Sequence, residues 1–462
     1  MSSPNPMYVA IVGAGPAGFY AAQHLLKQDP NVHVDMFDRL PTPYGLVRAG
    51  VAPDHQKIKS VTKQFDRTAA DPRFRFFGNV EIGKHLSVAE MAGLYHQIIY
   101  TTGAQTDRQL GIPGEELTGS HAATEFVAWY NGHPDFRDYK FDLTQEHAVV
   151  VGVGNVAIDV ARILCRSYDE LHETDIADYA LEALKESKVK TVYILGRRGP
   201  AQAAFTLTEI KEMGELSEAT AVIPEADITL DPLSQAEVDA AQDRATLRKL
   251  EVMNSFTHEP SDEKPRNLIF RFLVSPTELL GDENGQLTGV RMVHNELYQT
   301  DNGTLRPRAT DRYEEIPAGL LFRSIGYRGV PVPGVPFHER WGVINNDTGR
   351  VTDSESGEFV VGHYTAGWIK RGPSGVIGTN KADAVETVDL MLADAAEGKT
   401  LQPTVASDEA RLALIQERQP DYFSYADWQT LDKLETEAGA AQGRPRLKFS
   451  TIADMVAAVK GK

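Results

Sequence analysis

Two strand–turn–helix segments with glycine-rich turns constrain the fold of this chain more than any other feature. The first is YVAIVGAGPAGFYAAQHLLK at residues 8–27, and the second is AVVVGVGNVAIDVARILC at 148–165. Each runs from a β-branched apolar strand through a glycine turn into apolar residues at helical spacing. Such a segment opens a β-α-β unit, which builds a parallel sheet. The sequence therefore predicts an α/β fold with two Rossmann-like dinucleotide-binding domains.

The domain organisation follows from the spacing of these two units within 462 residues, a length typical of about three domains' worth of material. A further glycine-rich segment near the end, VVGHYTAGWIKRGPSGVIGTN, leads into another helical pattern. We expect a discontinuous first domain at 1–105 and 325–462, the latter part ending in a helical tail. This domain encloses a second one at 106–324.

The first glycine turn has the pattern of a dinucleotide site. Gly13, Gly15 and Gly18 form G-x-G-x-x-G directly after a strand: the first glycine permits the tight turn, the second the approach of a pyrophosphate, and the third close helix packing. Asp38 ends the next strand, 20 residues after Gly18, where it can accept a hydrogen bond from a ribose hydroxyl. The alternative is a purely structural glycine turn.

The second turn carries a different charge at the end of its second strand. Gly152, Gly154 and Ala157 form the G-x-G-x-x-A variant. The strand VKTVYIL is followed by Arg197 and Arg198, where the first unit has an acid. An arginine fork binds a 2′-phosphate, which predicts NADPH here and FAD in the first site. Arg197 lies 43 residues after Gly154, about twice the usual spacing. The alternative is that both arginines form surface ion pairs with the acidic helices.

Composition excludes several classes of protein. The net charge of −18 argues against nonspecific nucleic-acid binding, and no apolar run is long enough to predict a membrane span. The single cysteine, Cys165, excludes a CxxC redox pair and a cysteine-ligated cluster, and its apolar helical setting predicts a buried small side chain. The first residues lack the basic region of a signal peptide. The cysteine usage makes the cytoplasm the expected compartment.

Five longer motifs resemble one family, the adrenodoxin-reductase-type NADPH–ferredoxin reductases, with the bacterial FprA type nearest. They are LPTPYGLVRAGVAPDH (40–55), DPRFRFFGNV (71–80), GNVAIDVARIL (154–164), GRRGPAQAAFT (196–206) and GWIKRGPSGVIGTN (367–380). The resemblance implies hydride transfer from NADPH to noncovalent FAD, followed by single-electron transfer to a ferredoxin-type iron–sulfur protein.

The resemblance also implies site residues, and it predicts no metal site. The expected FAD-site residues are Gly13, Gly15, Ala17, Asp38, Leu46, Ile82, Trp368, Gly375, Val376 and Ile377. The expected NADP-site residues are Arg108, Val153, Gly154, Asn155, Val156, Arg197, Arg198 and Glu209, with Gly375 shared. The expected catalytic residues near the flavin are His55 and Glu212.

Simpler interpretations stand beside these roles. A lone histidine such as His55 is more often structural, and Glu212 has the pattern of a solvated surface charge. Asp159 has the helical spacing to pair with Arg162.

Gly367 is followed by Trp368 where many relatives with two dinucleotide folds have an aspartate, so a ribityl contact must come from elsewhere.

The electron acceptor is expected to be a small acidic ferredoxin. Residues 39–75 hold eight lysines and arginines against three acids, a net +5 within a chain of −18. Such a face would steer an acidic partner, although several of these charges are expected to be only solvated. The alternatives are a flavin-dependent NADPH monooxygenase or oxidase, and a non-catalytic nucleotide-binding module. The single cysteine excludes a thioredoxin or disulfide reductase.

Overall fold

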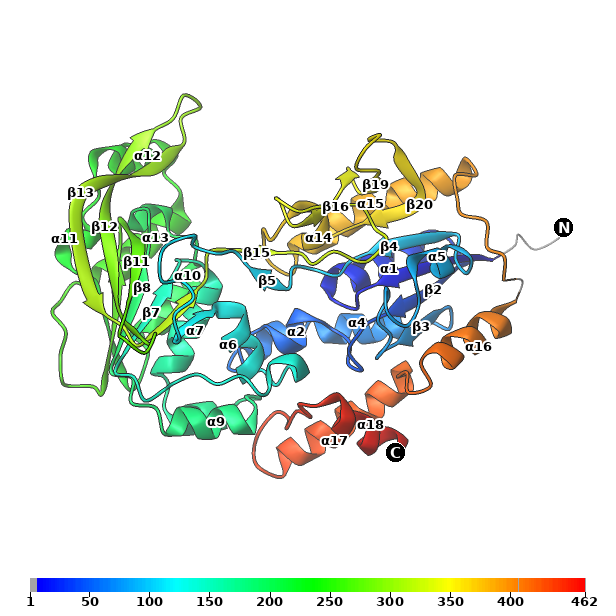
Figure 1. Ribbon diagram of the computed structural model, residues 1–462, viewed down its shortest axis with the longest axis horizontal. Coiled ribbons are helices and arrows are strands. Elements are labelled where there is room, and N and C mark those ends of the chain that lie inside the picture. The colour runs from blue at the N-terminus through cyan, green and yellow to red at the C-terminus, as the bar shows by residue number, and fades with distance from the viewer. Residues whose placement is uncertain (1–5, 406, 462) are drawn as a thin grey trace. The chain divides into compact units, whose positions relative to one another are not determined.

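The computed structural model describes residues 6–405 and 407–461, which form two compact units (Figure 1). Unit 1 comprises the chain up to Thr106, Asn131–Asp135, and the chain from Gly326 on; unit 2 comprises Asp107–Tyr130 and Phe136–Ile325. Residues 1–5, on which the expectation of no signal peptide partly rests, lie outside the described range. The described residues include no helix long and apolar enough to cross a membrane.

Residues 131–135 differ from the expected division, because they group with unit 1 although the sequence placed them in the enclosed domain. Two contacts explain this. Arg39 pairs with Asp135 at 2.6 Å, and Lys448 Nζ donates to Asn131 Oδ1 at 3.3 Å. Neither Arg39 nor Lys448 is near this segment in sequence, so the sequence could not predict that residues 131–135 belong to unit 1.

Unit 1 is built on a seven-stranded sheet of order β18-β19-β20-β4-β1-β2-β3. The strands from β20 to β3 are parallel, and the two short edge strands are antiparallel. The bounds are β1 (Met7–Val12), β2 (Val32–Phe37), β3 (Phe74–Phe77), β4 (Gln97–Tyr100), β18 (Asn346–Asp347), β19 (Arg350–Thr352) and β20 (Phe359–Thr365). The short pairs outside this sheet are β15 (Tyr327–Arg328) with β5 (Thr106–Asp107), and β16 (Phe337–His338) with β17 (Val343–Ile344).

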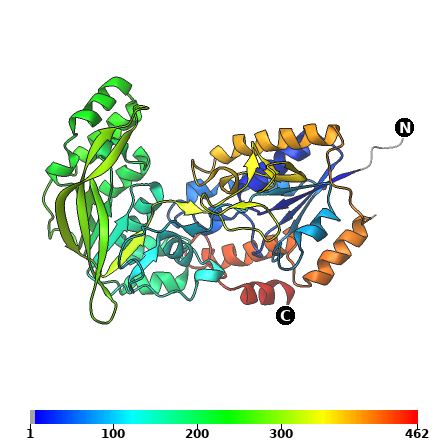
Figure 2. The same ribbon diagram turned by 45° about the horizontal axis from the view of Figure 1, so that its top comes forward.

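The helices of unit 1 cover both faces of this sheet. They are α1 (Pro16–Gln28), α2 (Leu46–Ala49), α3 (Gln56–Lys59), α4 (Thr62–Ala69), α5 (Val88–Ala92), α14 (Trp368–Arg371), α15 (Thr379–Ala396), α16 (Asp408–Arg418), α17 (Tyr425–Ala440) and α18 (Ile452–Lys460). Because strand side chains alternate, Val9 and Ile11 face one core with α1 and α15, while Ala10 and Val12 face the other. Figure 2 shows α15 along one face of the sheet.

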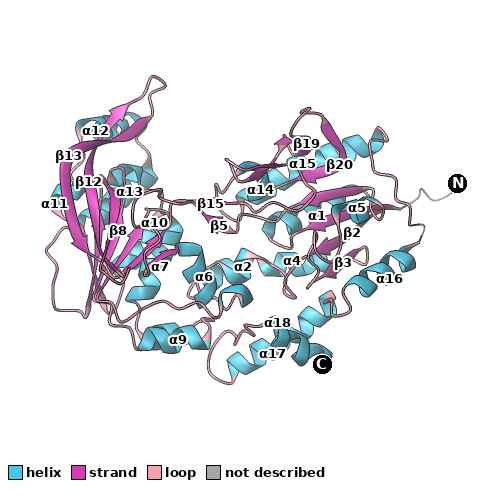
Figure 3. Cartoon of the chain, viewed as in Figure 1, coloured by secondary structure: helices cyan, strands magenta, loops and turns pink. Residues whose placement is uncertain are grey.

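Unit 2 contains a six-stranded, all-parallel sheet of order β6-β14-β7-β8-β10-β9. Its strands are β6 (Ser120–Ala122), β7 (His147–Val151), β8 (Thr191–Leu195), β9 (Ala219–Val222), β10 (Arg266–Arg271) and β14 (Leu320–Arg323). An antiparallel sheet of β11 (Val274–Gly281), β12 (Leu287–Gln299) and β13 (Leu305–Pro317) covers one face (Figure 3).

Helices cover the other face of the unit 2 sheet. They are α6 (Ala123–Tyr130), α7 (Asn155–Cys165), α8 (Tyr168–His172), α9 (Asp178–Lys185), α10 (Leu207–Gly214), α11 (Glu225–Ile228), α12 (Pro232–Ala241) and α13 (Arg244–Asn254), with a 3-10 turn at Pro200–Gln202. Another 3-10 turn, Pro134–Phe136, begins in the 131–135 segment of unit 1. Alternate residues of β7 again divide between the two cores: Ala148 and Val150 face the helices, and Val149 and Val151 face the antiparallel sheet. The predicted α/β class with two Rossmann-like units is confirmed.

The residues between Thr174 and Lys188 explain the long spacing before the arginine pair. They contain α9, which is added between α7 and β8 and packs Leu181 and Leu184 into the unit 2 core. Cys165 is fully buried at the end of α7, as predicted, and burial raises the pKa of its thiol to about 12. It is therefore an inert packing residue.

Candidate functional site

The first glycine turn has the shape that a bound pyrophosphate requires. Gly13 has φ +111°, and a Cβ there would lie 2.6 Å from the carbonyl oxygen of Thr101. A Cβ on Gly18 would lie 2.3 Å from Gly13 O, so helix and strand pack too closely for a side chain. Gly15 instead has no atom within 4 Å of its missing Cβ. It caps α1 without a side-chain hydrogen bond, which leaves the helix N-terminus open to an anion.

Asp38 connects this turn to the loop that follows β2. Its carboxylate accepts hydrogen bonds from the backbone N–H groups of Ala14 and Leu40, each at 2.9 Å. Burial raises the pKa of Asp38, and these two hydrogen bonds oppose the shift. The side chain is half-buried beside the turn, and its remaining lone pairs can accept from a ribose hydroxyl.

Two loops far apart in sequence approach the first turn. Tyr44 N donates to Ala14 O at 2.8 Å, and a Cβ on Gly45 would lie 3.1 Å from the Cα of Gly15. A Cβ on Gly367 would lie 2.7 Å from that of Ala17. The structure therefore brings together the turn, the segment that continues into Leu46, and the segment that continues into Trp368.

The segment after β20 is ordered by its own contacts. Gly367 has φ +81° and donates its N–H to Asp383, while Trp368 Nε1 donates to Ser374 O at 3.1 Å. The indole ring stacks on Tyr327 with centroids 5.8 Å apart. Sequence reasoning missed Asp383, which lies on α15 and anchors the backbone immediately before Trp368.

The remaining FAD-site candidates differ in exposure. Leu46 and Val376 are 46% and 59% exposed, so both apolar side chains are available for contact with a ligand. Ile82 is buried and Ile377 is partly buried against the unit 1 core. Gly375 has φ +79°, and the N–H of Val376 donates to Thr379 at the start of α15.

The second glycine turn repeats the design of the first within unit 2. Gly152 has φ +132°, and a Cβ there would lie 2.2 Å from Ser324 O. Gly154 has no atom within 4 Å of its missing Cβ, and it caps α7 without a side-chain hydrogen bond. Ala157 is fully buried in the third position. The turn can therefore hold a second pyrophosphate.

The arginine pair lies beside this turn. Leu195 O accepts from Gly152 N at 2.9 Å, and a Cβ on Gly196 would lie 2.9 Å from Val153 Cγ1. Arg197 is exposed and Arg198 is half-buried. Among residues 6–405 and 407–461, neither guanidinium forms an ion pair, so the alternative of surface pairs with acidic helices is not what the structure shows.

The loop after the arginines is tied to the second turn. Val153 O accepts from Ala204 N at 2.9 Å and from Phe205 N at 3.0 Å. Asn155 Oδ1 accepts from the N–H of Thr206, which is the N-cap of α10, at 3.0 Å. Val156 follows on α7 and is partly buried against the core. The position of α10 is thus set by the turn itself.

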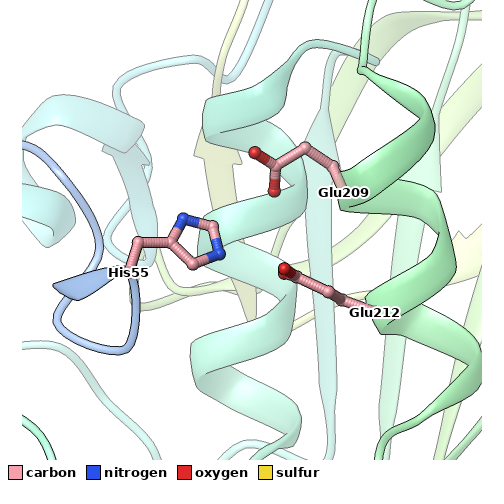
Figure 4. Close-up of side chains that lie close together, drawn as sticks. All are labelled: His55, Glu209 and Glu212. Atoms are coloured by element: carbon pink, nitrogen blue, oxygen red, sulfur yellow. The ribbon is translucent and has the colours of Figure 1, made fainter. Parts of the chain in front are cut away.

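Glu209 and Glu212 lie three residues apart on α10 and project from one face of it (Figure 4). Arg162 Nη1 lies 3.3 Å from Glu209 Oε2 and 3.4 Å from Glu212 Oε2. Its Nη2 lies 2.7 Å from Asp159 Oδ1, which confirms the predicted pair on α7. The interpretation of Glu212 as a merely solvated charge is therefore wrong, because it pairs with a buried guanidinium.

His55 belongs to unit 1, where it is the N-cap residue of α3. Its N–H donates to Ala52 O at 3.0 Å and its carbonyl accepts from Ile58 N at 3.1 Å. The half-buried imidazole extends from the loop before the helix (Figure 4). Arg108, in contrast, is exposed in unit 2 just after β5, and no described residue pairs with its side chain.

The basic stretch at 39–75 is less basic at the surface than its composition indicates. Four of its arginines are used in ion pairs within unit 1: Arg39 with Asp135, Arg48 with Glu435, Arg73 with Asp71, and Arg75 with Asp35 and Asp408. Lys57, Lys63 and Arg67 remain exposed, and Lys59 is half-buried. The charge available to a partner is concentrated between residues 57 and 67.

Comparison with known proteins places the chain in one family. Residues 7–194 match the family model described as pyridine nucleotide-disulphide oxidoreductase. Over 455 residues the chain is 47% identical to the NADPH-ferredoxin reductase FprA of Mycobacterium leprae, an alignment covering 97% of each protein. The chain belongs to the NADPH-ferredoxin reductase family.

The similarity extends to a plant protein and to a solved structure. The mitochondrial NADPH:adrenodoxin oxidoreductase of Arabidopsis thaliana is 40% identical, with 99% of this chain and 96% of that protein covered. A structure of Mycobacterium tuberculosis FprA in complex with NADPH matches with a TM-score of 0.91 at 45% identity, covering 99% of this chain and 100% of that one. The resemblance seen in the motifs is confirmed: the protein is an oxidoreductase enzyme, and the family name implies a ferredoxin partner.

Proposed function

We propose that this protein takes hydride from NADPH onto noncovalently bound FAD and passes the electrons singly to a small acidic ferredoxin-type iron–sulfur protein. Unit 1 is the FAD domain and unit 2 is the NADPH domain. The observation that carries the proposal is the pair of turns at Gly13–Gly18 and Gly152–Ala157, which share one design and differ in charge. The first lies beside Asp38, and the second lies beside Arg197 and Arg198.

The residues of unit 1 fit FAD. A Cβ would fill the open space at Gly15, and Asp38 stands beside the turn for the ribose. Leu46, Trp368 and the 375–377 segment would hold the flavin, which supplies the redox chemistry when bound. The N-terminal end of α15, capped by Gly378 without a side-chain hydrogen bond, favours negative charge near it.

The residues of unit 2 fit NADPH. The open Gly154 and the N-terminus of α7 would bind the pyrophosphate, while Arg197 and Arg198 would bind the 2′-phosphate. Arg108 and Glu209 complete this site in the proposal. His55 and Glu212 act near the nicotinamide and flavin rings.

The proposal of an acidic acceptor rests on the surface charge of unit 1, and the proposal of a cytoplasmic location rests on the single free thiol. The exposed cations from Lys57 to Arg67 favour an acidic partner, and Cys165 is a buried free thiol, which fits the reducing cytoplasm. Cell fractionation tests the compartment. Reduction of ferredoxins that differ in net charge tests the acidic character of the partner.

The decisive experiment is a visible spectrum of the purified protein before and after NADPH addition under argon. We expect a flavin spectrum that NADPH bleaches faster than NADH does, and acid precipitation should release all the FAD into solution. A colourless protein that does not oxidise NADPH would refute the proposal and favour a non-catalytic module. Flavin that stays on the precipitated chain would refute noncovalent binding.

A further inference from the structure

Arg162 is a fully buried cation in unit 2 that the family motifs do not assign to either cofactor. It lies on α7, two turns after the second glycine turn, and its side chain is 0% exposed. A buried charge is stable only where opposite charges and hydrogen bonds surround it. The partners of Arg162 therefore indicate what it does.

The guanidinium joins two helices through different nitrogens. Nη2 faces its own helix and contacts Asp159 at 2.7 Å. Nη1 faces α10 and lies between Glu209 at 3.3 Å and Glu212 at 3.4 Å. The planar fork of arginine makes this possible, because a lysine ammonium is a single point charge on a flexible stem.

The two glutamates need a shared cation to occupy one face of α10. Carboxylates three residues apart on a helix repel each other, and Glu209 is only 9% exposed, so water screens the repulsion poorly. Glu212 is 26% exposed, and it is the member of the pair that reaches solvent. Arg162 holds both carboxylates at one nitrogen and so fixes their orientation.

The N-terminus of α10 is also fixed by the second glycine turn, through the hydrogen bond from Thr206 N to Asn155 Oδ1. The backbone of the turn sets where α10 begins, and Arg162 sets where its two glutamates point. One helix, α7, supplies both anchors, since it begins at the turn and carries Arg162. The orientation of Glu212 is therefore fixed relative to the proposed pyrophosphate site.

We propose that Arg162 is a positioning residue for hydride transfer, acting through Glu212 and Glu209. The inference rests on the proposed function, in which Glu212 is an active-site group. It predicts that removing the guanidinium of Arg162 slows hydride transfer because Glu212 is no longer held in position. A change at Arg162 should therefore slow the reaction less when Glu212 has already been replaced.

A double-mutant cycle measures that overlap. The proteins are the FAD-loaded wild type, Arg162→Lys, Glu212→Gln and the double variant, and the readout is the rate of flavin bleaching by NADPH under argon. Arg166→Lys is the matched control, because Arg166 is the C-cap residue of α7, the helix that carries Arg162. Arg166 pairs with Glu170 at 3.1 Å and not with the two glutamates of α10. Bleaching of the wild type tests the proposed function separately.

We expect Arg162→Lys to slow bleaching at least tenfold in the wild type and less than threefold in the Glu212→Gln background, with Arg166→Lys close to the wild type. Equal losses in both backgrounds, or an equal loss in Arg166→Lys, would show a general structural role and overturn the proposal. If Arg162→Lys does not fold with FAD, Arg162→Gln in the Asp159→Asn background, which preserves the net charge, enters the same cycle under the same criteria.

Discussion

Arg48 and Glu435 lie 387 residues apart and form a two-point ion pair, with Nη1 donating to Oε2 at 2.8 Å and Nη2 to Oε1 at 2.5 Å. Glu435 is on α17 in the C-terminal tail and is fully buried. Arg48 is on α2, two residues after Leu46. Lys448 adds a third tie by donating to Arg48 O at 3.3 Å. The tail is therefore part of the structure that supports the proposed flavin site.

A second set of contacts holds the beginning of the same segment. Trp428 Nε1 donates to Tyr44 OH at 3.3 Å, and Tyr44 OH lies 2.8 Å from Tyr425 OH. Both partners are on α17. Because Tyr44 N is itself bonded to the first glycine turn, α17 supports the turn through one intermediate segment. Weakening the contacts of α17 should therefore weaken the binding of FAD.

Glu435→Gln tests this support. The change keeps the side-chain shape but leaves the buried arginine without its counter-charge, and breaking one partner of a buried pair costs about 3–5 kcal/mol. We expect a lower thermal midpoint and an FAD dissociation constant raised at least tenfold, measured by fluorescence of released flavin. Glu437→Gln is the control, because Glu437 is on the same helix and 63% exposed. Equal FAD retention in both variants would separate the tail from the flavin site.

The arginine pair should set the preference for NADPH. Each charge-assisted contact to the 2′-phosphate is worth about 1.5–3 kcal/mol, so losing it raises KM for NADPH on the order of tenfold to a hundredfold. Arg197→Ala with Arg198→Ala should leave steady-state kinetics with NADH nearly unchanged, because NADH lacks that phosphate. Arg312→Ala, an exposed arginine on β13, serves as the control. Equal damage with both cofactors would contradict the assignment.

His121 should make stability depend on pH. Burial lowers the pKa of this imidazole from 6.5 to about 4, with the charge of Arg323 acting in the same direction. Its stabilising contribution is therefore present above pH 6.5 and is lost as pH falls towards 4, because the unfolded chain binds the proton first. The ring packs on Phe141 at 4.8 Å, so phenylalanine can replace it.

Urea unfolding of the wild type and His121→Phe at pH 7.5 and pH 5 measures this contribution. Relative to the variant, the wild type should lose about 1–2 kcal/mol on going to pH 5. The same difference in unfolding free energy at both pH values would mean that the imidazole titrates normally in the folded protein.

The parts of the site that follow from local pattern were predictable, and those that depend on distant partners were not. Gly13 and Gly152 need left-handed backbone in a strand-to-helix turn, a requirement that the glycine spacing itself carries. The pairing of Asp159 with Arg162 is likewise a matter of helical spacing. Glu435, by contrast, has no local signature, because its partner Arg48 lies at the other end of the chain.

The basic stretch at 39–75 likewise shows that sequence alone does not reveal which charges are paired in the fold. Composition counts Arg73 and Arg75 as charge for a partner, but Arg75 is neutralised by Asp35 and Asp408, and only Asp35 lies near it in the sheet register. Asp408 comes from α16, 333 residues later. Net charge over a window can locate a basic segment, but it cannot tell which charges the fold has already paired.

The exposed cations between residues 57 and 67 should steer the ferredoxin. Opposite patches accelerate association at low salt, and the acceleration fades as the Debye length falls from roughly 30 Å at 0.01 M to 10 Å at 0.1 M. Ile58, 44% exposed among these charges, offers apolar contact after encounter. Charge reversal to glutamate at Lys57, Lys59 and Lys63 should therefore slow ferredoxin reduction at low salt, measured by stopped flow.

The control for net charge is the same triple reversal at Lys185, Lys188 and Lys190, which are exposed in unit 2. Both triple variants change the total charge equally, so only the location of the charge distinguishes them. Ferricyanide reduction needs no protein docking and should be unaltered in both, as should flavin bleaching by NADPH. If the first triple variant reduces ferredoxin at the wild-type rate in low salt, or the unit 2 variant is slowed as much, the docking face lies elsewhere. The next surface to test would then include Arg371, a half-buried cation three residues after Trp368.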